Sequence, residues 1–248
     1  MENTNLKILS TPNNLFEDNY IKAREKEKRV YTEQEITNLP FISKSDIHYK
    51  EWNMRVKSYQ RFKKYIEKKN NNLSVLEIGC GNGWFSARLA DIPNTKVAGL
   101  DVNLTELKQA SSIFKKNNLT FFYGNIFEEI FPSNSFDIIV LNAAVQYFPN
   151  LTTLINQLNK ILKENGEIHF IDSPFYKIQE IINAKQRTLD YYTQLGYPEM
   201  STHYYHHDFN ELKNNTIRIL YNPSTFSKKI KSILFGKDSP FLWIKIKK

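Results

Sequence analysis

The sequence predicts an α/β protein in which helices cover both faces of a mostly parallel β-sheet. Apolar runs of strand length alternate with helical patterns from residue 73 onward, and this alternation is typical of a parallel sheet. The runs are almost continuously apolar, as expected of strands that are buried on both faces. A third observation is the glycine-rich stretch VLEIGCGNGWFS (75–86), which falls where the first predicted strand turns into a helix.

The composition is that of a globular protein, because 41% of the 248 residues are hydrophobic and 14% are aromatic. Cys80 is the only cysteine, so an internal disulfide is excluded and a cytoplasmic location is expected. The first residues lack a basic start followed by an apolar core, so no signal peptide is expected. No run reaches the ~18 apolar residues of a membrane span.

Residues 1–72 are expected to form an N-terminal helical extension, or cap. The first part of this region is polar and is expected to be loose. Residues 19–36 predict a helix, since glutamates and basic residues alternate at helical spacing. Residues 47–69 predict a second helix, because one apolar stripe recurs at steps of three or four residues. The stripe consists of Trp52, Val56, Tyr59, Phe62 and Ile66.

The remaining elements follow from the same patterns. Asn103 or Thr105 is expected to cap the second helix after residue 73, and Gly166 to end the third. The last two strands are joined by a basic insert, residues 226–235. The predicted strands are 73–79, 96–102, 119–126, 136–145, 167–173, 216–222 and 240–248, and the predicted helices are 83–92, 104–117, 151–165 and 176–196.

The glycine-rich turn predicts a nucleoside site. Gly79, Gly81 and Gly83 would let the backbone approach a ligand closely at the start of a helix. Asp101 ends the second predicted strand, where a carboxylate can accept hydrogen bonds from both hydroxyls of a ribose. A dinucleotide turn would have glycine at position 84, which is tryptophan here, so the pattern is E-x-G-x-G-x-G.

Three further features follow in order: YGNIF after the third strand, FDIIVLNAAVQYF as the fourth, and LNKILKENGEIHFID as helix, glycine turn and strand. With the turn, they make residues 73–248 resemble class I S-adenosylmethionine-dependent methyltransferases. The resemblance implies a Rossmann-like three-layer sandwich whose seven-stranded sheet is mostly parallel, with the last strand antiparallel. Residues 73–248 would then be the cofactor-binding methyltransferase domain.

The resemblance implies S-adenosylmethionine as the cofactor and S-adenosylhomocysteine as its product. By position, Asp101 would hold the ribose and Asn142 would lie near the transferable methyl group. Arg55 or Trp52 would contact the cofactor's carboxylate, although Trp52 also fits a simple core role. The other residues carried over are Glu77, Gly79, Cys80, Gly81 and Gly83 around the methionine part, with Val102, Asn103, Asn125 and Ile126 beside the adenine.

The stretch PEMSTHYYHHDFNEL (198–212) holds three of the five histidines. In the family that the chain resembles, insertions here form a lid, so residues 196–215 are expected to be a lid over the acceptor. His203, His206 and His207 are candidates for a general base or a substrate contact, with packed surface as the alternative. A metal site is not expected, because no other Cys/His cluster exists. Aromatic candidates for the acceptor pocket are Tyr20, Tyr147, Tyr204 and Tyr205.

The expected activity is methyl transfer to a small-molecule acceptor in secondary metabolism, by in-line displacement at the sulfonium. Positioning supplies most of the catalysis, since the donor is already activated.

DSPFY (172–176) is similar to a motif that holds amino groups, but it follows the fifth strand and contains Ser173, which favours a simple turn. The net charge of +8 lies mainly at the two ends. This leaves an RNA or protein methyltransferase as an alternative, and a non-catalytic nucleoside-binding protein as another. No RNA-binding module is found, so nucleic acid is not the expected partner.

Overall fold

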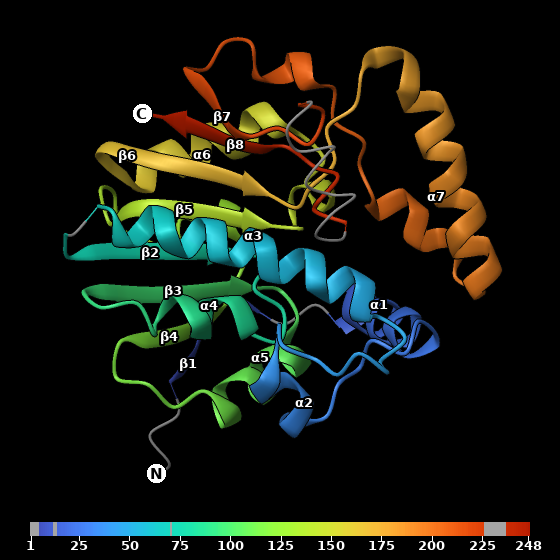
Figure 1. Ribbon diagram of the computed structural model, residues 1–248, viewed down its shortest axis with the longest axis horizontal. Coiled ribbons are helices and arrows are strands. Elements are labelled where there is room, and N and C mark those ends of the chain that lie inside the picture. The colour runs from blue at the N-terminus through green and yellow to red at the C-terminus, as the bar shows by residue number, and fades with distance from the viewer. Residues whose placement is uncertain (1–4, 12–13, 70, 226–236) are drawn as a thin grey trace.

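The computed structural model describes residues 5–11, 14–69, 71–225 and 237–248. An eight-stranded sheet forms the middle layer, in the order β1-β4-β3-β2-β5-β6-β8-β7 (Figure 1). The predicted α/β architecture is confirmed, but the sheet has eight strands rather than seven. The strands are β1 (Leu6–Ile8), β2 (Leu73–Ile78), β3 (Thr95–Asp101), β4 (Leu119–Tyr123), β5 (Phe136–Asn142), β6 (Leu162–Ile171), β7 (Ile217–Tyr221) and β8 (Trp243–Lys247).

The additional strand is β1, in the segment that was expected to be loose. It pairs in parallel with β4, with Leu6 opposite Phe121. The side-chain amide of Asn5 holds the segment further, because its Nδ2 donates to the carbonyl oxygen of Phe114 at 2.9 Å. This prediction was wrong because three residues are too few to show a strand pattern. Their pairing groups are satisfied by the exposed edge of β4, which is distant in sequence.

Strand order reverses beside β2, which has β3 on one side and β5 on the other. In such sheets the carboxyl ends of the strands diverge at the reversal and leave a crevice for a ligand. β8 runs antiparallel to both β6 and β7. The predicted antiparallel ending of the sheet is therefore confirmed.

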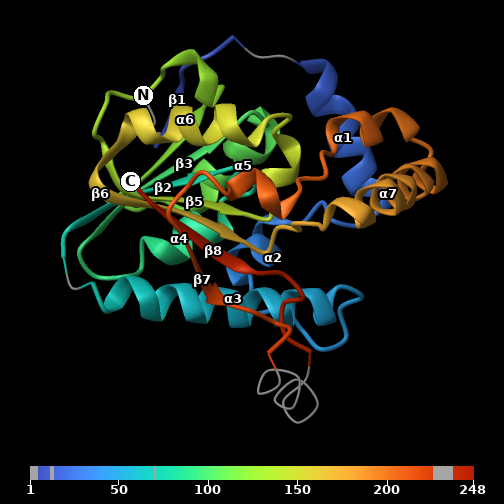
Figure 2. The same cartoon turned by 90° about the horizontal axis from the view of Figure 1, so that it is seen from above.

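The seven α-helices of the described residues lie on the two faces and at one end of the sheet (Figure 2). Buried side chains of α3, α4 and α5 form a core with one face, and those of α6 form a second core with the other. α7 projects beyond the sheet and packs beside α1. The helices are α1 (Asn14–Lys26), α2 (Glu33–Asn38), α3 (Tyr49–Glu67), α4 (Trp84–Leu89), α5 (Leu104–Ile113), α6 (Leu151–Ile161) and α7 (Ile181–Leu195).

The single helix predicted over residues 19–36 is wrong, because two helices, α1 and α2, occupy this region. α1 ends where Lys28 adopts the left-handed conformation, with φ of 56°. The backbone N–H of Arg29 then donates to the carbonyl of Arg24 at 2.8 Å, as in a helix-ending Schellman motif. Thr32 starts α2 through a capping box with Glu35. The charge pattern runs through both helices and does not mark this break.

The helix predicted over 47–69 is confirmed as α3, and four of its five stripe residues are buried. Asn103 caps α5, because its side chain accepts from the backbone N–H of Glu106 at 3.0 Å. The end of the helix predicted over 151–165 is wrong, since α6 stops at Ile161 and β6 begins at once. A bulge in β6 takes up residues 163–166, so Asn165 rather than Gly166 adopts a positive φ, of 63°.

Four short 3-10 helices border the site or the segment after α7: η1 (Ile126–Glu128), η2 (Val145–Tyr147), η4 (Pro198–His203) and η5 (Phe209–Leu212). A fifth, η3 (Ile178–Glu180), precedes α7. The basic insert at 226–235 lies outside the described residues. Within the described ranges, no helix combines the length and the apolar character needed to cross a membrane.

Candidate functional site

A cavity of about 390 Å³ opens at the carboxyl ends of β2, β3 and β5, where the strand order reverses. One wall is the edge of the sheet, and the other comes from α1, α3 and the segment between α1 and α2. Of the thirteen cofactor candidates named from the sequence, twelve line this cavity: Trp52, Arg55, Glu77, Gly79, Cys80, Gly81, Asp101, Val102, Asn103, Asn125, Ile126 and Asn142.

The glycine turn forms the floor of the cavity. Gly79 has φ of 72°, and a Cβ added there would lie 2.6 Å from the Cβ of Ala144, so any other residue would clash as well as be strained. Gly81 has φ of 49° and also borders the cavity. Gly83 does not line it. Gly83 instead packs at the start of α4 against the ring of Phe121, which a Cβ would approach to 2.7 Å.

Asp101 is held in place by the backbone around it. Its two carboxylate oxygens accept from the N–H groups of Gly81 at 2.7 Å and Asn103 at 2.8 Å. Burial raises the pKa of Asp101, while these hydrogen bonds oppose the rise. Each carboxylate oxygen has a second lone pair, so Asp101 can still accept hydrogen bonds from a ligand's hydroxyl groups.

Glu77 is the most deeply buried acid of the cavity wall, with 2% of its surface exposed. Its carboxylate accepts from the hydroxyl of Ser86 at 2.5 Å. Burial raises the pKa of Glu77 to about 8, although the hydrogen bonds from Ser86 lower it. Without a cationic ligand, Glu77 is therefore largely protonated at neutral pH.

Three arginines, Arg24, Arg29 and Arg55, line the wall opposite the sheet. Their partners are two glutamates that do not line the cavity. Arg24 pairs with Glu27 at 2.7 Å, and Arg55 pairs with Glu51 at 3.0 Å. Arg29 contacts both glutamates. Carboxylates outside the cavity lining thus orient the guanidinium groups. The arginines give this wall the positive charge that suits a ligand's carboxylate.

Trp52 serves two roles in the structure. Its ring lies 5.4 Å from that of Trp84, within the core beneath α3. Its indole Nε1 donates to the hydroxyl of Tyr31 at 2.8 Å, and both residues also line the cavity. The core and cavity roles that the sequence left as alternatives are therefore compatible.

The residues expected near the adenine lie beyond Asp101, at the ends of β3 and β4. Val102 is 43% exposed beside the cavity, whereas Ile126 is buried. The side chain of Asn125 accepts from the N–H of Phe127 at 3.1 Å and so starts η1. Asn142, at the end of β5, has a buried Oδ1 atom without a hydrogen-bond partner among the described residues.

These features fit S-adenosylmethionine chemically. Gly79 and Gly81 border the cavity with backbone alone, Asp101 offers acceptors for a diol, and the arginine wall offers donors for a carboxylate. The unpartnered Asn142 oxygen gives a buried acceptor at the cavity surface, of the kind that a ligand satisfies.

Part of the cavity lining is aromatic. Tyr20 and Tyr147 line it with their rings 6.1 Å apart, and Arg24 donates to the Tyr147 hydroxyl at 3.1 Å. Tyr204 does not line the cavity but contacts the Tyr147 ring from behind, at 6.1 Å. Tyr205 does not line it either, and its N–H donates to a backbone carbonyl of η2. The structure thus brings two of the four predicted tyrosines to the cavity.

None of the three histidines between residues 198 and 212 lines the cavity. His207 is 3% exposed, with Nε2 3.3 Å from the carbonyl oxygen of Val145. His206 lies 2.9 Å from the hydroxyl of Thr188 on α7, and burial lowers its pKa. His203 is exposed at the end of η4. Two of the three therefore attach this segment to η2 and α7, and no metal-binding group of three or more suitable side chains occurs in the described part of the chain.

The sequence reasoning missed Arg24, Arg29 and Glu106. A signal existed for Arg24, since Tyr20 and Arg24 are four residues apart on one predicted helix and therefore share a face. Arg29 lies outside any helix and carried no such signal. Glu106 follows Asp101 by five residues, in the first turn of the next helix, which could have marked it as a second acid near the same strand end.

A family model described as "Methyltransferase domain" matches residues 69–220. The chain is 30% identical over 132 residues to malonyl-acyl-carrier-protein O-methyltransferase 2 of Ilyobacter polytropus, covering 51% of each chain. It is 30% identical over 115 residues to demethylmenaquinone methyltransferase of Lactococcus lactis, covering 42% of this chain and 46% of the relative. The chain thus matches about half of the length of these relatives.

Among solved structures, geranyl diphosphate C-methyltransferase of Streptomyces coelicolor is similar, with a TM-score of 0.56 and 12% identity. The match covers 95% of this chain and 98% of that one. At this identity the likeness concerns the fold, which is shared from the N-terminal helices to the last strands.

Proposed function

The chain belongs to the S-adenosylmethionine-dependent methyltransferase family, and from this premise we propose that its methyl acceptor is a small molecule. S-Adenosylmethionine supplies an activated methyl group on a sulfonium, so the protein's main task is to hold donor and acceptor in line. The observation that carries the proposal is that one cavity combines two kinds of lining. Asp101 and the glycine turn line it from the sheet, and Tyr20, Arg24 and Tyr147 add aromatic rings and a cation to the same space.

The part of the cavity lined by Tyr20 and Tyr147 has the character of a small-molecule pocket, in which apolar rings surround a few polar groups. The Arg24 guanidinium lies 4.8 Å from the centre of the Tyr20 ring and binds the Tyr147 hydroxyl. Burial raises the pKa of Tyr20 well above its ordinary value. Tyr20 therefore offers a neutral hydroxyl group, and Arg24 offers a fixed cation beside the Tyr147 hydroxyl, for orienting an acceptor.

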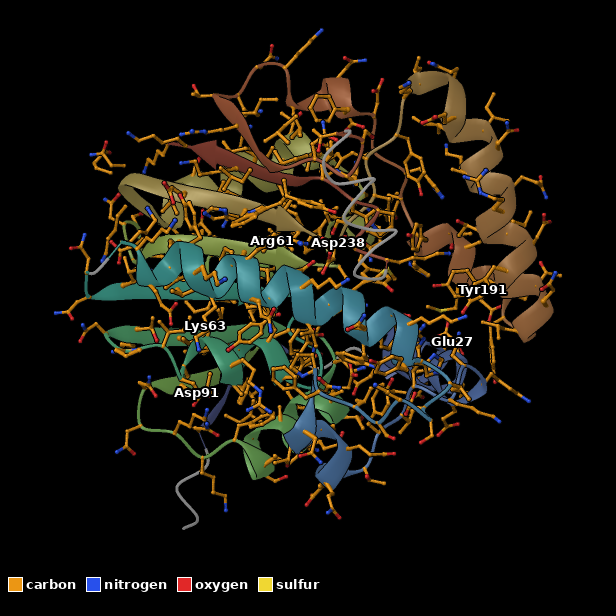
Figure 3. All side chains as sticks on the ribbon, viewed as in Figure 1. Glu27, Arg61, Lys63, Asp91, Tyr191 and Asp238 are labelled. Atoms are coloured by element: carbon orange, nitrogen blue, oxygen red, sulfur yellow. The ribbon has the colours of Figure 1, made fainter. Side chains whose placement is uncertain are left out.

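Residues 1–72 would act as the cap of this pocket, and residues 196–215 as a lid beside it. Two contacts support this division. The hydroxyl of Tyr191 on α7 donates to Glu27, which lies beneath the arginine wall (Figure 3). The ring of Tyr204, within the proposed lid, packs against Tyr147. Cap, lid and pocket would therefore order together when an acceptor binds.

Catalysis in this proposal depends on positioning. The glycine turn and Asp101 would orient the donor, and Asn142 lines the cavity at the end of β5. A general base is needed only when the acceptor must lose a proton to become nucleophilic. No histidine lines the cavity, so the proposal assigns no histidine as a base.

The proposal is tested by following the methyl group from carbon-14-labelled S-adenosylmethionine. The purified protein is incubated with a bacterial cell extract, which is then separated into small molecules, RNA and protein. We expect label in the small-molecule fraction, and none above background with Asp101→Ala. Label in RNA or protein would assign the chain to one of the alternative acceptor classes, and label in no fraction would favour a non-catalytic binding protein.

A further inference from the structure

Glu106 lies in the first turn of α5 and lines the same cavity as Asp101. We propose that Glu106 is a second donor-binding acid beside Asp101, whose carboxylate accepts a hydrogen bond from a ribose hydroxyl of S-adenosylmethionine. The inference rests on the proposed donor site and adds one consequence, namely that donor binding releases a proton near neutral pH.

The position of Glu106 is defined by the glycine turn. Its Oε2 lies 3.3 Å from the point where a Cβ of Gly81 would stand, so the carboxylate lies directly over the open face of that glycine. The N–H of Gly81 binds Asp101 at 2.7 Å. Two carboxylates therefore border one residue of the turn. A diol held by Asp101 would then lie close enough to the Glu106 carboxylate for a hydrogen bond.

The Glu106 carboxylate has no hydrogen bond and no ion pair with any residue in the described ranges. Only its backbone N–H forms a hydrogen bond with a side chain in these ranges, because it donates to Asn103, the residue that caps α5. The other two acids of this wall are satisfied, Glu77 by Ser86 and Asp101 by two backbone amides. An ionisable group without a partner on a cavity wall is characteristic of a ligand contact, because the ligand supplies the missing hydrogen bond.

The charges around Glu106 come from two elements. Asp101 faces it from the end of β3, and Arg24 and Glu17 face it from α1. The neutral side chains of Tyr20 and Cys80 also border it. Burial, together with the like charge of Asp101, raises the pKa of Glu106 to about 7, although Arg24 lowers it.

The direction of the pH effect follows from this environment. A hydroxyl that donates to Glu106 stabilises the ionised carboxylate, so the pKa of Glu106 falls when the donor binds. A proton is released on binding, and affinity rises with pH through the free protein's pKa. With a pKa of about 7 that falls below 6 in the complex, the dissociation constant decreases about tenfold between pH 6 and pH 8.

The test is calorimetric titration with S-adenosylhomocysteine at pH 6, 7 and 8. We expect the dissociation constant of the wild-type protein to fall about tenfold over this range, and that of Glu106→Gln to fall clearly less. Glu25→Gln, an exposed acid on α1, should behave as wild type. Equal pH dependence in wild type and Glu106→Gln, or a wild-type dependence of opposite sign, would overturn the proposal.

Two further measurements keep the outcome clear. Titration of the wild-type protein with 5′-methylthioadenosine at pH 7 in phosphate and in Tris reports proton release in the absence of a ligand ammonium that would ionise Glu77, and no release would overturn the proposal even if Glu106→Gln does not fold. 5′-Methylthioadenosine lacks the amino-acid part of the donor. Its affinity should keep the same pH dependence, and a loss of that dependence would contradict a ribose contact. A failure of S-adenosylhomocysteine to bind at any pH would instead reject the donor site itself.

Discussion

At the scale of single residues, the charge of each carboxylate near the cavity depends on its surroundings. Burial raises the pKa of Glu77 to about 8 and that of Glu106 to about 7. Burial also acts on Glu51, but Arg55 and Arg29 outweigh it and lower the pKa of that group to about 2. The acids that face the ligand space are thus poised to change charge on binding, whereas the acid behind the arginines stays ionised.

Asp101→Ala is expected to weaken the binding of S-adenosylhomocysteine at least about tenfold, because it removes a pre-oriented charged acceptor. The measurement is isothermal titration calorimetry at a fixed pH. Asp91→Ala is the matched control, since Asp91 is an exposed surface acid paired with Lys116, and it should leave the affinity unchanged. If Asp101→Ala bound as tightly as the wild type, Asp101 would have no part in the donor site.

At the scale of elements, the break between α1 and α2 places two of the three cavity arginines. Arg24 is on the last turns of α1, and Arg29 follows the left-handed residue Lys28. Because the chain turns there, the two guanidinium groups converge on Glu27 from different directions. An uninterrupted helix would separate them by five residues, which is more than one turn. The arginine wall therefore depends on how α1 ends.

Lys28→Gly is expected to raise the free energy of unfolding by about 0.5 to 1 kcal/mol, since glycine adopts the left-handed conformation without a side-chain penalty. Chemical denaturation of the protein without ligand measures this change. Lys22→Gly, at an exposed position within α1, should instead destabilise the protein by about 1 kcal/mol. Destabilisation by both substitutions would show that Lys28 is not the residue that ends α1.

At the scale of the whole molecule, the acids of the cavity lower the stability of the ligand-free protein. Glu77 and Asp101 on the sheet edge, together with Glu106 on α5, line the same cavity as the arginine wall. The acids are buried without full compensation, as their raised pKa values indicate. Such a site is a compromise between stability and binding, because the groups that bind the ligand are costly to bury without it.

The stability of the ligand-free protein should therefore depend on the charge of Glu77. Its pKa in the folded protein is about 8, above the ordinary value of 4.5, so the protonated form is favoured by folding. This contribution is fully present below pH ~4.5 and is lost as the pH rises to about 8. Glu77→Gln should raise the free energy of unfolding by at least about 1 kcal/mol at pH 8, with little gain at pH 5.

Urea unfolding at the two pH values measures this difference. The control is Glu67→Gln, because Glu67 is an exposed acid at the end of α3 whose ion pair with Lys63 lies on the surface. It should show no difference of this kind between pH 5 and pH 8. A Glu77→Gln variant that is equally or less stable than the wild type at pH 8 would show that Glu77 is not held as a neutral group.

The predictions made from sequence were right where a local pattern has one physical solution. Near-continuous apolar runs require strands that are covered on both faces, and this determined the α/β sandwich and its antiparallel ending. The glycine turn followed by an acid at the next strand end led to the cavity, since parallel strands bring their carboxyl ends to one edge. The long apolar stripe of α3 was visible for the same reason.

Other features were decided only by the tertiary structure. β1 exists because the edge of β4 was open to pairing, and the histidines of residues 198–212 lie away from the cavity because two of them hold that segment to its neighbours. Arg24 and Arg29 come from a different part of the chain than Glu106 and reach the same cavity only through folding. Sequence by itself determined which strand ends carry the site, because periodicity and turn chemistry are local properties. The folded structure decided which charges face one another there, because their approach depends on contacts between residues far apart in the chain.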